Sequence, residues 1–319
     1  MKEVLLELLQ MAQDMILNVL GFVCDMGNRQ LLKEFGSAYK KDNTVFRVSH
    51  PLDPSKSLFC FPDMVHLFRS LKEVWCKIGS VKLPQDVVIR FGLRSNPVNF
   101  DHVKLVSEFQ ADMDFKFVPK LNTKELEADH FRKTDLPNAR CILEDKVGMT
   151  LDLLIYCNDA PEEYSTTAWF VRLLNRWFKL VISRTTSLAL SHEVPEAYAK
   201  AIADLKLVSE LMKTMRLDEE WKVVQMATES ILAIPEILLS NAGYNFVLLG
   251  RFLHDVVENI FPIVRAISPT PTAVEFKYAL KRVVLSQFFF HNRKSSYEAD
   301  DREEAVGLKH LLKLAQEAV

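Results

Sequence analysis

The sequence has little of several residues that define common protein classes. It contains nine glycines and thirteen prolines in 319 residues and no low-complexity tract, which excludes collagen-like and disordered classes. The five cysteines form no Cys-x-x-Cys pair, which argues against a disulfide framework and a zinc site. We therefore expect buried, reduced thiols and an intracellular, reducing compartment for the cysteines, which are Cys24, Cys60, Cys76, Cys141 and Cys157.

The chain also lacks an excess of charge of one sign. It has 40 Lys and Arg against 42 Asp and Glu, so the formal net charge is −2. A free-standing DNA-binding domain usually carries a basic excess. Any contact with nucleic acid would therefore come from local patches or from a partner.

Long hydrophobic runs are missing as well. The stretch Ile231–Leu239 is interrupted by Pro235 and is too short to cross a bilayer, and the amino-terminal segment has an early acid and no cleavage-site pattern. We expect neither a membrane span nor a signal peptide. Apolar residues make up 49% and charged residues 26%, which is typical of a folded soluble protein.

Hydrophobic periodicity predicts an α/β opening followed by a mainly helical chain. The opening contains a helix over 4–16, a strand over Val19–Cys24, a helix over Arg29–Phe35 ending at Gly36, and a strand over Leu58–Phe61. The later spacing predicts helices over 64–78, 99–111, 136–157, 163–184, 194–216, 218–241, 244–261, 273–290 and 302–317. The polar linker 292–301 suggests that the last helix is loosely attached.

Acids at the ends of predicted elements are the candidates for chemistry. Asp25 directly follows a buried strand, and Asp255 and Glu258 lie three residues apart on one face of the predicted helix 244–261. Converging carboxylates could hold Mg²⁺ for phosphoryl transfer. The alternative is that Asp25 caps the next helix and that the other two are solvated, and the spacing alone favours it. His66 is expected to be a capping or packing residue, and no nucleotide-binding loop or G-x-S-x-G motif occurs.

Four sequence blocks occur in a characteristic order. The first block runs from Phe22 through Asp25-Met26-Gly27-Asn28 to Gly36, and the second joins Ser49-His50-Pro51 to the strand and helix start at 58–67. A helix at 167–178 follows, and the last block spans 253–261 with Phe276–Arg282. In this order the blocks resemble the P-element-type DNA transposases, which include the THAP-domain transposases, and the resemblance covers roughly residues 1–290.

The resemblance implies a fold that is α/β plus mainly α, namely an incomplete ribonuclease-H-like fold interrupted by a large helical insertion of the GTP-binding type. The implied domains are residues 1–62 as the amino-terminal remnant and 63–243 as the insertion. Residues 244–290 would complete the ribonuclease-H-like domain, and 291–319 would form the charged linker and terminal helix. The first strands of that fold and the zinc-coordinating THAP domain would lie upstream of Met1.

The resemblance also implies roles for individual residues. Asp25 matches the second Asp and Glu258 the Glu of an Asp-Asp-Glu triad, and both would bind Mg²⁺ if the site were active. Lys120 and Asp255 match residues that contact GTP. A family Asp is replaced by Lys179, which removes an acceptor for guanine. Pro262 should end or kink its helix, and two residues of the loop after Asp25 are deleted.

Four hypotheses follow. The favoured one is a domesticated, non-catalytic transposase-derived protein, nuclear or nucleocytoplasmic, that binds protein partners and, weakly, DNA. The second is an active metal-dependent transposase or nuclease, which needs a first Asp from an upstream segment or a partner. The third is a GTP-binding helical module, and the fourth is an unrelated helical adaptor. The sequence leaves the oligomeric state open.

Overall fold

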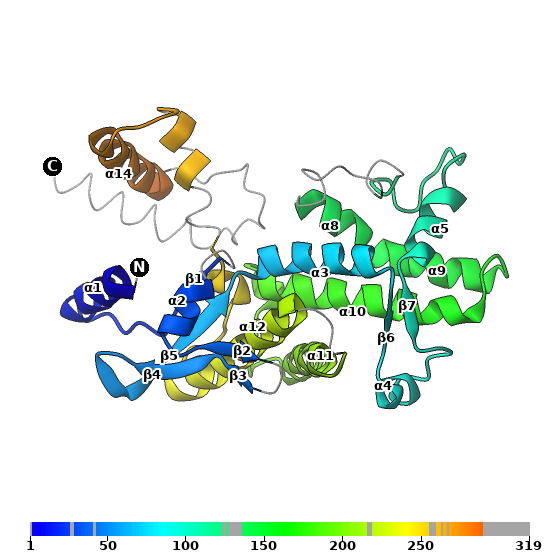
Figure 1. Ribbon diagram of the computed structural model, residues 1–319, viewed down its shortest axis with the longest axis horizontal. Coiled ribbons are helices and arrows are strands. Elements are labelled where there is room, and N and C mark those ends of the chain that lie inside the picture. The colour runs from blue at the N-terminus through cyan, green and yellow to red at the C-terminus, as the bar shows by residue number, and fades with distance from the viewer. Residues whose placement is uncertain are drawn as a thin grey trace.

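The computed structural model gives a mixed α/β protein in which helices predominate (Figure 1). It describes residues 2–25, 29–40, 43–122, 126, 136–215, 219–254, 260–262, 264–266 and 268–289. Asp255 and Glu258, the linker 292–301 and the predicted helix 302–317 lie outside the described residues.

The opening segment contains more strands than the sequence predicted. Its elements are α1 (Lys2–Asp14), β1 (Gly21–Cys24), α2 (Arg29–Glu34), β2 (Ala38–Lys40), β3 (Asn43–Val45), β4 (Arg47–His50) and β5 (Asp53–Pro62). The main sheet has the order β1-β5-β4, with β1 parallel and β4 antiparallel to β5, and β2 pairs with β3 in a separate hairpin. The expectation of two strands was wrong because β2, β3 and β4 are short and half polar, so no apolar run marks them.

The middle of the chain is mainly helical. Its elements are α3 (Met64–Ile78), β6 (Ser80–Lys82), α4 (Gln85–Arg90), β7 (Pro97–Asn99), α5 (Asp101–Phe109), α8 (Leu136–Ile142), α9 (Asp145–Tyr156), α10 (Ser165–Ile182), α11 (Pro195–Thr214) and α12 (Glu219–Pro235). Short 3-10 turns are η2 (Glu162–Tyr164), η3 (Thr186–Leu188) and η5 (Leu249–Phe252), and η4 (Glu236–Asn241) is a π-helical turn that continues α12. The last described helix is α14 (Ala273–Phe289).

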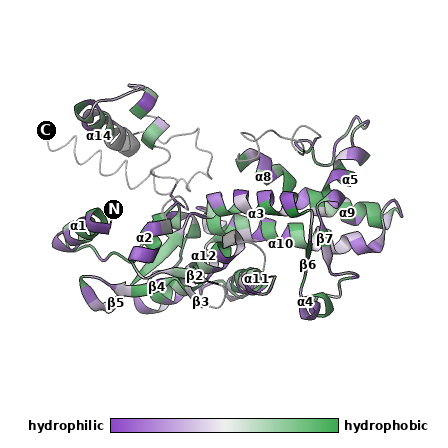
Figure 2. Ribbon diagram, in the orientation of Figure 1, coloured by the Kyte–Doolittle hydropathy of each residue, from purple (hydrophilic) through white to green (hydrophobic). Residues whose placement is uncertain are grey.

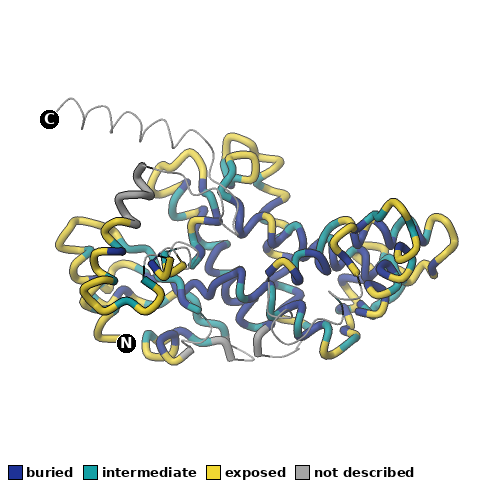
Figure 3. Tube along the Cα trace, turned by 90° about the horizontal axis from the view of Figure 1, so that it is seen from above, coloured by how far each residue is buried: buried dark blue, intermediate teal, exposed yellow. Residues whose placement is uncertain are grey.

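The hydrophobic core runs without interruption from the sheet into the helices (Figure 3). Phe68 of α3 stacks on Phe178 of α10 with 3.8 Å between the ring centroids. The indole N–H of Trp177 donates to Thr228 of α12 at 3.1 Å, and the hydroxyl of Ser230 donates to the carbonyl of Cys60 in β5 at 3.0 Å. Helix α12 therefore connects the sheet to the helical part through buried contacts. Apolar and hydrophilic residues alternate along α3, as its amphipathic pattern predicts (Figure 2).

The predicted helix 136–157 is two helices. The helix is interrupted at Leu143 and Glu144, and Glu144 has an extended backbone. The side chain of Asn175 in α10 donates to the carbonyl of Leu143 at 2.8 Å. This hydrogen bond satisfies a carbonyl that the break leaves without a helical partner.

The predicted helix 244–261 was wrong over residues 244–254, whereas residues 260 and 261 are helical. Val247 pairs with Leu190 in an antiparallel bridge, and a 3-10 turn follows at η5. The N–H of Gly250 donates to the carbonyl of Ser183 at 2.9 Å, and a Cβ on Gly250 would lie 2.7 Å from that oxygen. Close packing of the backbone against the end of α10 therefore replaces helical hydrogen bonds in this segment.

One described helical stretch, Trp221–Asn241, is long and apolar enough to cross a membrane. Most of it is buried inside the protein, where it packs against β5, α3 and α11. Core helices commonly satisfy the same criteria, so this stretch is only a weak indication of a membrane span.

The junction of α5 and α10 contains a buried histidine that should make stability depend on pH. His102 is 8% exposed, stacks on Tyr164 and contacts the hydroxyl of Thr167 at 2.8 Å. Burial lowers the pKa of His102 below its ordinary value of 6.5, against the opposing effect of Glu163 and Asp101. The folded state therefore binds fewer protons than the unfolded state as the pH falls below 6.5.

We expect the free energy of unfolding to fall as the pH is lowered from 7.5 toward 5. The pKa of His102 is lower in the folded state than in the unfolded state, so the unfolded state takes up this proton first and acidification favours it. The stability that His102 contributes is therefore present above its unfolded pKa and is lost as the pH falls below it. His102→Gln should reduce this pH dependence, and urea denaturation of both proteins across the range measures the difference. Comparing the two proteins cancels the contributions of the other titrating groups. An unchanged slope in the variant would contradict the assignment to His102.

Candidate functional site

Two acids follow neighbouring parallel strands. Cys24 of β1 is in register with Pro62 of β5, so Asp25 and Asp63 leave the sheet side by side. The N–H of Asp63 donates to the carbonyl of Cys24 at 3.1 Å, which continues the pairing by one residue. The carboxyl ends of these strands therefore form an acidic edge, the usual place for functional residues in parallel sheets.

The carboxylate of Asp63 is completely buried and fully engaged by the backbone. One oxygen accepts from the N–H of His66 at 3.1 Å and caps α3, and the other accepts from the N–H of His254 at 3.1 Å. Asp63 thus ties the strand ends to the start of α3 and to a segment 191 residues further along. A buried carboxylate needs such donors because an unpaired one would be costly.

His66 lies between the two acids. Its Nδ1 is 3.9 Å from an oxygen of Asp25, and its Nε2 is 3.9 Å from an oxygen of Asp63. A guanidinium nitrogen of Arg69 lies 2.6 Å from Nδ1. Because guanidinium only donates, Nδ1 must accept this bond, which places the proton of a neutral ring on Nε2. The cap of α3 is Asp63, and His66 supplies the backbone N–H from which that cap accepts, so the expected capping or packing role of the His66 side chain stays a prediction.

The buried thiols next to this edge are protonated at neutral pH. Burial, with smaller contributions from Cys60, Asp25 and Asp63, raises the pKa of Cys24 to about 12. Burial also raises the pKa of Cys60 to about 12. A protonated thiol is a much poorer nucleophile and metal ligand than a thiolate. Cys24 and Cys60 therefore pack as small hydrophobic residues. All five cysteines are free, with Cys24, Cys60 and Cys141 buried, Cys76 half-buried and Cys157 exposed.

The structure describes only part of the site predicted from sequence. Asp25 is at the end of β1, as expected, and its side chain is 43% exposed. The hydrogen bond from the N–H of His254 to Asp63 holds the chain beside the acidic edge up to residue 254. The predicted site residues Asp255 and Glu258 lie outside the described residues. The described residues include no group of three or more His, Cys, Asp or Glu that could hold a metal ion.

The two lysines that the resemblance linked to a GTP site, Lys120 and Lys179, are both exposed. Lys120 lies in a turn after α5, and Lys179 lies in the last turn of α10. The turn around Lys120 is fixed by Gln110, whose side-chain amide donates to the carbonyls of Val118 and Leu121 at 2.8 Å each. Lys120 therefore projects from a well-held backbone.

Asp63 is the residue that sequence reasoning missed. It stood at the end of a predicted strand but was not singled out. An N-cap pattern was available, because an Asp directly before an amphipathic helix commonly accepts from the third helical N–H. Its second partner, His254, could not be inferred from spacing.

Comparison with known proteins agrees with the resemblance found in the sequence. The chain is 24% identical over 285 residues to the transposable element P transposase of Drosophila melanogaster, covering 84% of this chain and 35% of that protein. It is also similar to the solved Drosophila P element transposase strand transfer complex, with a TM-score of 0.74, 19% identity, and coverage of 89% of this chain and 64% of that one. The chain is related to the P element transposases. It spans about a third of the length of the curated relative. No family model matches it.

Asp63→Ala should destabilise the protein by about 2–4 kcal/mol, because it removes a helix cap and leaves two backbone amides without an acceptor. Urea denaturation measures the change. Asp86→Ala, at an exposed acid in the first turn of α4, is the matched control and should change stability by less than about 0.5 kcal/mol. Equal effects of the two substitutions on the free energy of unfolding would show that the hydrogen bonds of Asp63 make no measurable contribution to stability.

Proposed function

We propose that this chain is a transposase-derived protein that acts by binding protein partners and, more weakly, nucleic acid, without catalysis. Its relation to the P element transposases supports the origin. The observation that carries the binding role is an exposed apolar stripe on α1. A nuclear or nucleocytoplasmic location belongs to the same proposal, since transposases act on DNA.

The apolar stripe consists of Val4, Leu8 and Met11 of α1 and of Met15 in the turn directly after it, and these residues are 54–63% exposed and recur at helical spacing. Leu9 is the buried residue of α1, so the helix rests on the protein by its other side. Ile16 and Leu17, directly after α1, are 94% and 58% exposed. Contiguous apolar surface of this kind marks protein interaction sites.

Strand β1 lies at the same end of the molecule as α1 (Figure 1). It forms the edge of its sheet, and within the described residues no strand pairs with its outer side. An unpaired edge can accept a strand from another chain. A partner that adds a strand here and covers an apolar helix face would suit both features.

A minor role for nucleic acid is supported by the charge distribution. The net charge is −2, and several arginines of the helical part are paired with carboxylates. Arg176 contacts Asp204 through two nitrogens at 2.9 and 3.1 Å, and Arg172 contacts Asp152 at 2.8 Å. Paired arginines have less capacity to neutralise phosphates.

We expect Leu8→Glu combined with Met11→Glu to abolish capture of a stoichiometric partner from native cells. Both side chains are exposed, so the substitutions should not disturb folding. Ile89→Glu, at a residue of α4 that is 72% exposed, is the control and should leave capture intact. The captured protein is then purified, and its affinity for each variant is measured directly. Capture that survives the α1 substitutions would refute a binding role for the stripe.

The non-catalytic part of the proposal is tested with labelled DNA and Mg²⁺ or Mn²⁺. We expect no cleavage above that of Glu258→Ala. Metal-dependent cleavage that is lost in Glu258→Ala and kept in Glu275→Ala, an exposed acid of α14, would instead support the metal-dependent nuclease alternative. In that case Asp25 and Glu258 would be the metal ligands.

GTP binding is the second candidate function, favoured by the exposed position of Lys120 on a turn held by Gln110. In this hypothesis Lys120 contacts the nucleotide and Asp255 lies near the guanine base. A specific ligand at 100 times its Kd stabilises by about 2.7 kcal/mol, which a thermal shift with GTP and Mg²⁺ detects. The shift should be lost in Lys120→Ala and kept in Lys82→Ala, another exposed lysine. No shift at millimolar GTP would exclude this function.

A further inference from the structure

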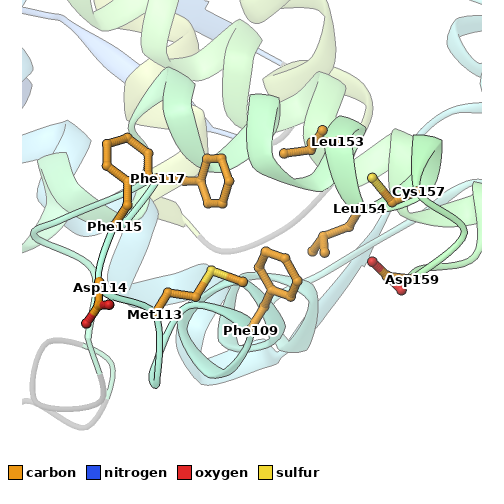
Figure 4. A pocket seen from close by; sticks show the side chains of 9 residues that line it. All are labelled: Phe109, Met113, Asp114, Phe115, Phe117, Leu153, Leu154, Cys157 and Asp159. Carbon is orange, nitrogen blue, oxygen red and sulfur yellow. The ribbon is translucent and has the colours of Figure 1, made fainter.

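The far end of the helical part contains an apolar pocket of about 430 Å³ between the end of α5 and the end of α9. Figure 4 shows aromatic side chains from the α5 side, among them Phe109 and Phe117, facing Leu153 and Leu154 of α9. No residue assigned to the acidic edge or to GTP lines it. The pocket is therefore a separate feature of the fold.

The wall on the α5 side is held in place before any ligand arrives. Gln110 is 1% exposed, and its side-chain oxygen accepts from the N–H of Val118 at 2.9 Å while its amide donates to two carbonyls of the same loop. Lys116 adds bonds to the carbonyls of Gln110 and Ala111 at 3.3 and 3.1 Å. A pre-formed wall lowers the entropic cost of binding.

The pocket is open on the side of Phe115. This lining residue is 73% exposed and meets Phe117 edge to face at 5.6 Å. A pocket for a small molecule usually encloses most of its ligand. An open pocket with an exposed aromatic ring in its lining instead suits a side chain presented by a larger surface.

The surroundings of the pocket are acidic. Asp114 and Asp159 lie on opposite sides of it (Figure 4), and Glu108 and Asp112 are exposed on the same stretch as Asp114. Lys116 is the one basic residue of stretches 108–117 and 153–159. Charge complementarity therefore favours a positively charged partner.

We propose that this pocket is a docking site for a protein segment that carries a bulky apolar side chain flanked by Lys or Arg. The apolar side chain fills the space between Phe117 and Leu154. The flanking cations lie against Asp114 and Asp159. This surface is independent of the α1 stripe, so either proposal can fail while the other holds.

The test uses the full chain and two short fluorescein-labelled helical peptides. One has Leu and Trp on one face and Lys on the other, and its matched partner has Glu in place of every Lys. We expect the Lys peptide to bind at least about tenfold more tightly by fluorescence anisotropy, with the preference falling as salt is raised. Equal affinity for both peptides would overturn the proposal.

Variants locate the binding. Asp114→Lys combined with Asp159→Lys should remove the preference for the Lys peptide, whereas Asp112→Lys, an exposed acid of the same loop that does not line the pocket, should retain most of it. Phe115→Ser should weaken binding about fivefold or more, while Ile89→Ser, equally exposed on α4, should not. All five positions are exposed, so unchanged urea midpoints confirm folding. Binding that survives both pocket variants would overturn the proposal.

Two other occupants give distinct results. Saturable binding of phenethylammonium at the pocket without binding of either peptide would assign it to small cationic molecules. Self-association in sedimentation that Phe115→Ser abolishes, again without peptide binding, would assign it to a second copy of this chain. Either result would overturn the proposal.

Discussion

The buried carboxylate of Asp63 joins parts of the chain that are remote in sequence. Its two oxygens accept from backbone amides at the start of α3 and at His254, and its own N–H continues the pairing of β1 with β5. Removing the side chain would leave these amides buried without an acceptor, which costs more than the hydrogen bonds contribute in net stability. The direction in which the chain leaves η5 therefore depends on this one residue.

The rest of the core extends from that junction. Helix α3 leaves the Asp63 cap with Phe68 directed onto Phe178 of α10, and α10 in turn contacts α12 through Trp177 and Thr228. Helix α12 returns to the sheet, where Ser230 bonds to the carbonyl of Cys60. The sheet and the helices thus stabilise one another through a closed set of buried contacts. This arrangement explains how a sheet as small as β1-β5-β4 can have a well-packed face.

The sequence predicted those elements whose hydrophobic pattern is local. The helix over 64–78 was predicted with the bounds that α3 has, because its apolar residues recur at helical spacing over the whole segment. Segments fixed by distant contacts were not predictable. Val247 and Gly250 are held by Leu190 and Ser183, so their apolar spacing was mistaken for a helix. The role of Asp63 depends on His254, 191 residues away, and only the fold brings the two together.

At the acidic edge, a buried residue that holds the fold lies beside an exposed residue that could do chemistry. Asp63 is buried, whereas Asp25 is 43% exposed and Lys120 and Lys179 are exposed. A substitution at an exposed residue costs little stability, so a change at Lys179 should leave α10 intact. A substitution at Asp63 would weaken the whole junction whatever the protein does. The buried junction therefore limits which residues of this edge can change, whereas exposed residues such as Asp25 and Lys120 can vary without loss of the fold.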